Sequence, residues 1–349
     1  MPPVPGVKAK VQINGQFIAP GSRVELKLPL PPLYTGAAMG MPVTVIRGKK
    51  DGPRLFVSAA IHGDEINGVE IIRRLLASSF VKRIRGTLIL VPVVNVYGYA
   101  SKSRYLPDRR DLNRAFPGSA TGSMSARLAH TFMTEIVANA SHGIDLHTGA
   151  KHRTNLPQIR TSLNDTEALA MADAFRVPVI LNAELRDGSL RATAADVGCK
   201  VLLYEGGEAL RFDEFAIRAG LRGVVNVMRY LGMLPARALS RAMLPQLSQQ
   251  SCWVRANGSG ILLTPCKLGD TVKKQQLIAQ ISTPLGDKSK AIYSPVDGVI
   301  IGQATLPLVH EGEALFNIAH IEAPARMEAS LPHFYDNLER LDESDFAPL

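Results

Sequence analysis

Hydrophobic and polar residues alternate over the first 50 positions in short runs typical of β-strands. The strict alternation at 24–28 and at 43–46 predicts two strands that each bury one face. Between two further short runs, Asn14-Gly15 predicts a tight hairpin, because both residue types tolerate the positive φ of a type I′ turn. We therefore expect residues 1–45 to form an antiparallel β edge of a larger sheet.

From residue 54 onward, apolar runs of strand length alternate with helical patterns. Strands are predicted at 55–61, 87–94, 143–146, 157–161, 177–181 and 200–205, and helices at 65–78, 124–139, 165–175, 189–197 and 213–232. This alternation predicts a sheet with helices on both faces, and nearly continuous apolar strands are typical of parallel strands buried on both sides. We predict an α/β domain over residues 46–235 with a mostly parallel or mixed central sheet.

The pattern changes again after a connector that contains Pro and Ser, at 233–250. Short alternating runs between 251 and 320 are separated by Gly-Asp and Pro turns, which predicts a small, barrel-like all-β domain. The final segment, 321–349, is acidic and only weakly helical in pattern. We expect this tail to lie on the surface or to be partly disordered.

Composition narrows the class of protein. The chain has 349 residues, of which 46% are hydrophobic and 20% charged, as is ordinary for a globular enzyme. No apolar run approaches the ~18 residues of a membrane span, and the N-terminus has no apolar signal core. The three cysteines are widely spaced and fit buried thiols in a reducing compartment. We expect a cytoplasmic protein without a membrane partner.

The formal net charge of +9 raises the question of a nucleic-acid partner. The basic residues are mostly dispersed, however, and no stacking aromatic residues or nucleic-acid motif accompany them. We therefore expect no nucleic-acid role, and a positive field suits a small anionic substrate. The sequence does not decide between a monomer and a homo-oligomer.

Candidate metal ligands lie where predicted strands end. His62 and Glu65 follow the strand at 55–61, and His147 follows the strand at 143–146. Ligands gather at the carboxyl ends of strands in α/β sheets, and two imidazoles plus one carboxylate leave a position open on catalytic zinc. We predict one Zn²⁺ per chain at these residues. The alternative is structural: loop or core histidines, and a glutamate that interacts with the helix dipole.

A hydrolytic metal site also needs a base that takes a proton from water. Glu205 ends the strand predicted at 200–205, so its carboxylate should emerge at the same sheet edge. Glu208 is the second candidate, but it lies beyond two glycines. A carboxylate at a strand end can also merely cap the next helix.

The irregular stretch after residue 94 contains several arginines, whose planar guanidinium groups bind carboxylates. We select Arg109, Asn113 and Arg114 as substrate-binding candidates. One arginine of this stretch could also stabilise an oxyanion. For Arg109 the alternative is a solvated basic loop.

Four motifs of different chemistry occur in a recognisable order: HGDE at 62–65, DLNRAFPG at 111–118, DLHTG at 145–149 and YEGGE at 204–208. Together they resemble the succinylglutamate desuccinylase/aspartoacylase family, whose members are zinc hydrolases with a carboxypeptidase-like α/β fold. The resemblance implies that His62, Glu65 and His147 bind zinc. It further implies that Glu205 activates the attacking water, and that the Asn-Arg pair at 113–114 binds a substrate carboxylate.

One position departs from the family pattern. Aspartoacylases have an arginine two residues after a motif asparagine, and here Tyr97 follows Asn95 at that distance. We therefore expect the oxyanion role at Arg104 and place Tyr97 among the substrate-binding candidates. The C-terminal segment looks like the biotinyl/lipoyl-like β domain of a bacterial subgroup, without its lysine attachment motif.

These observations predict a zinc-dependent amidohydrolase that acts on carbon–nitrogen bonds other than peptide bonds. Its substrate is expected to be a small anionic N-acyl amino acid or a related N-acyl amine. The first alternative is a zinc carboxypeptidase that acts on short peptides. The second is a non-catalytic binding protein that keeps the pocket.

Overall fold

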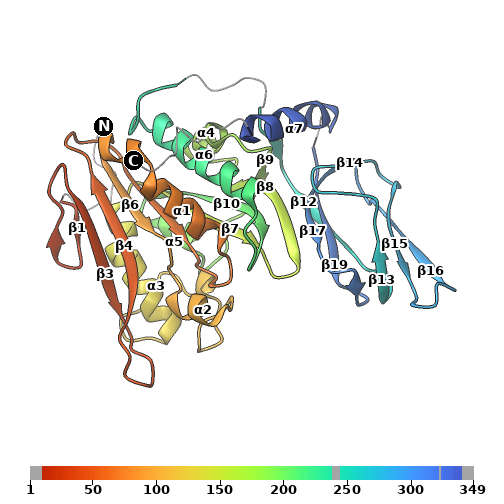
Figure 1. Cartoon of the computed structure of the whole chain (residues 1–349), viewed down its shortest axis with the longest axis horizontal. Helices are drawn as coiled ribbons and strands as arrows, with labels where there is room; N and C mark the ends of the chain where they lie inside the picture. Colours follow the sequence, from red (N-terminus) through yellow and green to blue (C-terminus); the bar gives the residue numbers. More distant parts are fainter. Residues whose placement is uncertain (1–9, 238–243, 322–323, 340–349) are drawn as a thin grey trace.

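The computed structural model describes residues 10–237, 244–321 and 324–339. It consists of an α/β body and a C-terminal β region that lies beside it (Figure 1). Parts of the expected N-terminal segment (1–9), connector (238–243) and tail (340–349) lie outside the described residues. Among those described, no helix is long and apolar enough to cross a membrane.

The N-terminal strands form two antiparallel pairs, of which one lies at the edge of the main sheet and the other is a separate two-stranded sheet. β1 (Gln12–Ile13) and β2 (Gln16–Phe17) pair as a hairpin, and the φ angles of Asn14 and Gly15 are 51° and 73°, as its turn requires. β3 (Arg23–Leu30) pairs with β4 (Met39–Arg47), and β4 also pairs with β6. The boundary expected at residue 45 therefore falls inside a strand of the main sheet.

The main sheet is mixed, as the sequence predicted. β6 (Thr87–Val91), β5 (Arg54–Ala59), β7 (His142–Gly149) and β10 (Lys200–Glu208) lie next to one another in parallel. β8 (Arg153–Thr161) adds to β10 antiparallel, and β9 (Val179–Asn182) follows β8 in parallel. The carboxyl ends of β5, β7 and β10 consequently meet at one edge.

Helices cover both faces of this sheet (Figure 1). One face carries α1 (Asn67–Ala77), α4 (Thr166–Phe175) and α6 (Glu214–Tyr230), whose apolar residues share a core with Leu55 and Val57. The other carries α2 (Val96–Ser101), α3 (Met124–Glu135) and α5 (Leu190–Asp196), packed with Phe56. Successive residues of β5 thus serve opposite cores, because strand side chains alternate between faces. Short 3₁₀ segments occur at Ser79–Arg83, Leu112–Arg114 and Val137–Asn139.

The C-terminal β region is present, and some of its strands continue the main sheet. Its strands are β11 (Gln246–Ser248), β12 (Ser251–Arg255), β13 (Gly260–Leu263), β14 (Thr271–Val272), β15 (Leu277–Ser282), β16 (Ser289–Tyr293), β17 (Gly298–Ala304), β18 (Leu308–Val309) and β19 (Ala314–Ala319). β17 pairs with β8, and the sheet then runs through β19 to β12. A second sheet has the order β16-β15-β13-β18.

The start of the expected acidic tail differs from the prediction. Residues Pro324–Glu339 form helix α7, which buries Met327, Leu331, Phe334 and Leu338 against both the α/β body and the β region. These apolar residues recur every three or four positions, the spacing of one helix face. The surrounding polar residues concealed this stripe, so the sequence pattern did not indicate that this part of the tail packs as a helix through one face.

Candidate active site

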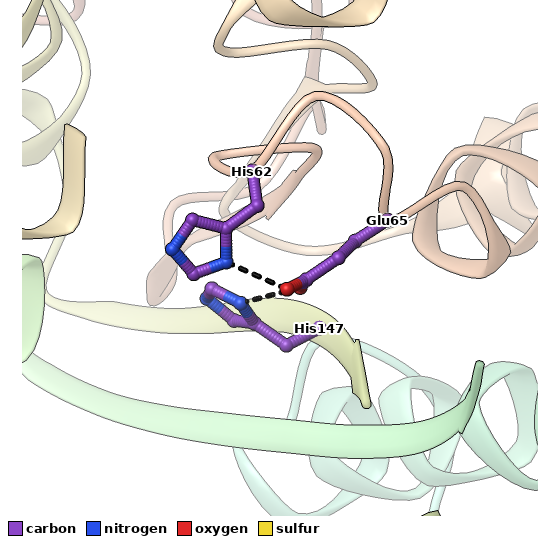
Figure 2. Close-up of side chains that lie close together, drawn as sticks. All are labelled: His62, Glu65 and His147. Carbon is purple, nitrogen blue, oxygen red and sulfur yellow. Dashed lines mark hydrogen bonds and ion pairs between the residues drawn. The ribbon is translucent and has the colours of Figure 1, made fainter. Parts of the chain in front are cut away.

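The three predicted metal ligands converge at the carboxyl end of the sheet (Figure 2). Nδ1 of His62 lies 2.7 Å from one carboxylate oxygen of Glu65, and Nδ1 of His147 lies 2.8 Å from the other. One potential ligand atom from each residue lies within 4.8 Å of the other two, and all three side chains are buried. Two imidazole nitrogens and a carboxylate oxygen are a donor set that suits zinc.

Local backbone features aim His62 and Glu65 inward. Ala60, directly after β5, has a φ of 52°, so the chain turns sharply where the strand ends. Gly63 then packs against α2, and a Cβ there would lie 2.0 Å from the carbonyl carbon of Gly98. Glycine in the HGDE motif is therefore required by close backbone contact.

A second layer of carboxylates holds the outer nitrogens of both imidazoles. Nε2 of His62 lies 3.1 Å from Asp111, and Nε2 of His147 lies 2.7 Å from Asp145, which also accepts from the hydroxyl of Ser58 at 2.8 Å. Such carboxylates keep the proton on Nε2 and leave the Nδ1 lone pair for a metal. Sequence reasoning missed both aspartates, although Asp145 precedes His147 by two residues on the same face of β7.

The electrostatic balance of this cluster favours a bound cation. Burial by itself would lower the pKa of both histidines, but Glu65 and Asp111 raise the pKa of His62, and Asp145 and Glu65 raise that of His147. Burial would raise the pKa of Glu65, but the two imidazoles hold it well below its usual range. The carboxylate is therefore ionised, and the residues present fit a divalent metal.

Glu205 lies on the strand next to His147. In the parallel pairing of β10 with β7, Glu205 is directly opposite His147. Oε2 of Glu205 accepts a hydrogen bond from the amide of Asn155, and Nε of Arg160 lies 3.2 Å from Oε1 without hydrogen-bonding alignment. Glu208 instead accepts from the backbone N–H of His152 at 2.9 Å. The geometry thus favours Glu205 over Glu208 as the base.

A cavity of 500 Å³ opens over this cluster. His62, His147 and Glu205 contribute to its wall, together with five arginines: Arg104, Arg114, Arg160, Arg186 and Arg191. Residues 249–251, which lead into β12, close one side. Basic side chains therefore surround the three candidate metal ligands in this cavity. Residues of both the α/β body and the C-terminal β region form its wall.

Three of the predicted arginine-loop residues line this cavity. The guanidinium of Arg104 lies 3.2 Å from Glu65 and 3.1 Å from Asp111, so it is fixed beside the candidate ligands. The side-chain oxygen of Asn113 accepts from the backbone N–H of Leu190 at 3.0 Å and anchors the loop to α5. Arg114 is more exposed and also contributes to the wall.

The other two predicted substrate-binding residues do not reach the cavity. Tyr97 is buried under the N-terminal segment, where its hydroxyl donates to the carbonyl of Pro31 at 2.5 Å. Arg109 is exposed, with a φ of 61°, and lies outside the cavity wall. The reason is local: α2 directs Tyr97 into the core, and the loop turns Arg109 toward solvent.

Arg191 is a cavity residue that sequence reasoning missed. Burial, followed by repulsion from Arg160 and Arg186, lowers the pKa of Arg191 to about 10, so it stays protonated at neutral pH. Its Nη2 donates to the backbone oxygen of Glu184 at 2.9 Å, whereas its buried Nη1 has no hydrogen-bond partner among the described residues. A buried cationic donor of this kind favours an anionic group in the cavity. A lone arginine in a helix gives no sequence signal for this role.

The fold and the site together define an α/β protein in which two histidines and one glutamate form a candidate metal centre at the carboxyl edge of the sheet. A family profile described as "Succinylglutamate desuccinylase/Aspartoacylase catalytic domain" matches residues 51–231. The chain belongs to this family, and the resemblance inferred from the four motifs is confirmed.

Known proteins give the same result. N-alpha-acetyl-L-2,4-diaminobutyric acid deacetylase from Halomonas elongata is 29% identical over 306 residues, which cover 82% of this chain and 87% of the relative. The solved succinylglutamate desuccinylase/aspartoacylase from Rhodobacter sphaeroides has a TM-score of 0.78 at 22% identity, covering 90% and 99% of the two chains. The product-bound ectoine utilization protein EutE (DoeB) from Ruegeria pomeroyi has a TM-score of 0.78 at 24% identity, covering 89% and 99%. These structures confirm the predicted fold class.

Proposed function

We propose that this protein is a zinc-dependent hydrolase that cleaves the amide bond of a small N-acyl amino acid or a related N-acyl amine. The observation that carries the proposal is the shared cavity: a buried His-Glu-His centre, a carboxylate on the adjacent strand and a ring of arginines. The Halomonas elongata relative, named as a deacetylase of an acetylated amino acid, supports the same reaction class.

His62, Glu65 and His147 would hold one zinc ion per chain. When bound, zinc supplies Lewis-acid chemistry, which makes an acyl carbonyl more electrophilic and lowers the pKa of water. Asp111 and Asp145 fix the orientation of the two imidazoles. All three ligands are buried, and His62 and His147 face the cavity in which the substrate would bind.

Glu205 is proposed as the general base. Its position opposite His147 places its carboxylate at the cavity wall, where it can take a proton from the attacking water and pass it to the leaving nitrogen. Arg104 is proposed to meet the negative charge that develops on the carbonyl oxygen. Its two ion pairs hold the guanidinium in place before the substrate arrives, which is the preorganisation that such stabilisation needs.

The remaining arginines suggest that the substrate carries a carboxylate. Arg191 has a buried N–H group for which the described part of the chain offers no partner, and Arg114 and Arg186 line the same cavity. A carboxylate would neutralise part of this charge and accept the free hydrogen bond. An amino acid moiety provides such a carboxylate, in agreement with the substrate class proposed above.

The decisive experiment compares Glu205→Gln with Glu208→Gln in zinc-loaded protein. Glu205→Gln should keep stoichiometric zinc and lose turnover of N-acyl amino acids by roughly 10²- to 10⁴-fold, because the base is gone. Glu208→Gln should stay near the wild type, since Glu208 bonds the turn backbone outside the cavity. Near-normal turnover of Glu205→Gln would remove Glu205 from this role.

The substrate class is tested with a panel of N-acetyl and N-succinyl amino acids alongside dipeptides. Higher kcat/KM for the N-acyl amino acids supports a deacylase. Higher kcat/KM for the dipeptides would instead support the carboxypeptidase alternative. A protein that binds no stoichiometric divalent metal would contradict the proposal as a whole.

A further inference from the structure

The junction between the α/β body and the C-terminal β region lies next to the proposed base. β17 pairs antiparallel with the beginning of β8, with Gly302 opposite Asn155 and Ala304 opposite Arg153. On its other edge, β8 pairs with β10, where Gly207 is opposite Asn155. Asn155 therefore lies between the β region on one side and the strand that carries Glu205 on the other.

The side chain of Asn155 connects these two strands. It is 7% exposed, and its amide nitrogen donates a hydrogen bond to Oε2 of Glu205. The pairing of β10 with β8 shifts register between Glu205 and Gly207, so a bulge brings the glutamate side chain to this amide. Among the described residues, this is the one aligned hydrogen bond to the Glu205 carboxylate.

Gly302 provides the space that the Asn155 side chain occupies. A Cβ at position 302 would lie 2.9 Å from Oδ1 of Asn155 and 3.2 Å from the Cβ of Asn317. The φ of Gly302 is outside the left-handed region, so its backbone conformation is open to any residue. Position 302 therefore favours glycine because there is little space for a side chain, and not because of its backbone conformation.

Other contacts make this junction firm. The amide of Gln158 donates to the backbone oxygen of Ile301 at 3.4 Å, and the guanidinium of Arg153 stacks over Trp253 at 5.3 Å. Leu156 of β8 packs in one apolar cluster with Val299 and Ile301 of β17. Because this junction is tightly packed, a shift of β17 would displace the side chains of β8.

We propose that the C-terminal β region positions the catalytic base: Gly302 of β17 sets the place of the Asn155 amide, and Asn155 fixes the carboxylate of Glu205. Asn155 and Gly302 are thus positioning residues, and the β region is a structural part of the active site. This inference rests on the proposed function, since it assigns a purpose to the contact with Glu205. This role of the β region does not require the lysine attachment motif that biotinyl/lipoyl-like domains carry.

The first test uses Asn155→Asp, which keeps the size and shape of the side chain. A role in strand packing alone would leave turnover nearly unchanged. A positioning role predicts a fall in kcat of roughly tenfold to a hundredfold, because the donor is replaced by a carboxylate that repels Glu205. KM should stay within about twofold, because substrate binding is assigned to other residues. Unchanged kcat in folded Asn155→Asp would overturn the proposal.

The second test is a double-mutant cycle with Gly302→Ala and Asn155→Ala. If Gly302 acts through Asn155, the two kcat losses should not add, and Gly302→Ala should have little effect once the side chain of Asn155 is gone. The matched control is Gly258→Ala in the same β region, where the new Cβ meets only the flexible end of Lys290. This control should keep wild-type kcat, and fully additive losses in the cycle would contradict the proposed connection.

Failure of this inference is distinguishable from failure of the proposed function. If Glu205→Gln is inactive while Asn155→Asp is fully active, the base assignment stands and the positioning role is lost. If Glu205→Gln itself stays active, the proposed function fails first. Zinc content and the melting temperature of every variant are measured in parallel, so that a loss of fold is separated from a loss of kcat.

Discussion

Asp145 is a buried residue that contacts the candidate metal centre through one of its histidines. Asp145 is 2% exposed, and its two carboxylate oxygens form hydrogen bonds with His147 and Ser58. The carboxylate thereby fixes both the tautomer and the orientation of the imidazole. A residue of this kind influences metal affinity through another side chain.

We predict that Asp145→Asn lowers zinc affinity by roughly 10- to 100-fold, because an amide holds the imidazole less firmly and can stabilise the wrong tautomer. The measurement is competition with a chelator of known affinity. Asp173→Asn, at an exposed position on α4, is the control and should bind zinc as the wild type does. Equal affinities for the two variants would count against the role of Asp145.

Arg191 gives a second prediction at this scale. Arg191→Met removes the charge but keeps an apolar stem, so KM for an N-acyl amino acid should rise by roughly 10- to 100-fold, the value of a charge-assisted hydrogen bond. The kcat should change much less. Arg109→Met is the matched control, because Arg109 is exposed outside the cavity. An unchanged KM in Arg191→Met would argue against a bound carboxylate.

At the scale of elements, the close packing of α6 against its neighbours depends on two glycines. A Cβ at Gly223 would lie 1.9 Å from the ring of Phe175 at the end of α4, and one at Gly220 would lie 2.4 Å from Ile71 of α1. Phe175 in turn stacks on Tyr204 of β10, with ring centroids 5.3 Å apart. These contacts join three helices to the strand that carries the proposed base.

Gly223→Ala should therefore destabilise the protein, although alanine usually favours a helix by about 1 kcal/mol relative to glycine. Overpacking costs about 1–3 kcal/mol and opposes that gain. We expect a lower midpoint of urea unfolding for Gly223→Ala and partial recovery when Phe175→Leu is added. A higher midpoint in the single variant would show that the helices have room to separate.

At the scale of the whole molecule, the β region and helix α7 cover apolar surface of the α/β body. Leu156, Val179, Leu181 and Ala219 of the body share a cluster with residues of β17, β19 and α7. β17 also occupies the edge of β8 next to the candidate active site, and residues 249–251 line the cavity. The two parts are therefore joined by a core as well as by backbone pairing.

A chain that ends at residue 237 should consequently aggregate or lose its activity, because it exposes this cluster and a free strand edge. Size-exclusion chromatography and a turnover assay on the shortened protein check this expectation. A monodisperse fragment with full activity would show that the body does not need the β region.

Much of the site was predictable because strand ends are readable in a sequence. His62, His147 and Glu205 each follow an apolar run, and parallel strands bring their carboxyl ends together. Arg191 and Asn155 were not predictable, because they reach the site from α5 and from β8 through contacts that no local pattern encodes. The position of Tyr97 away from the cavity has the same origin, since a place in a motif does not specify which way a helix turns its side chains.

Periodicity and motif spacing are local properties of the chain, and they were enough to predict the alternation of strands and helices, the family and the residues of the candidate metal centre. The set of arginines that share the cavity, and the position of β17 against β8 beside Glu205, depend on tertiary contacts. The physical reason is the distance along the chain: Gln158 and Ile301 are 143 residues apart and meet only through packing of the whole molecule.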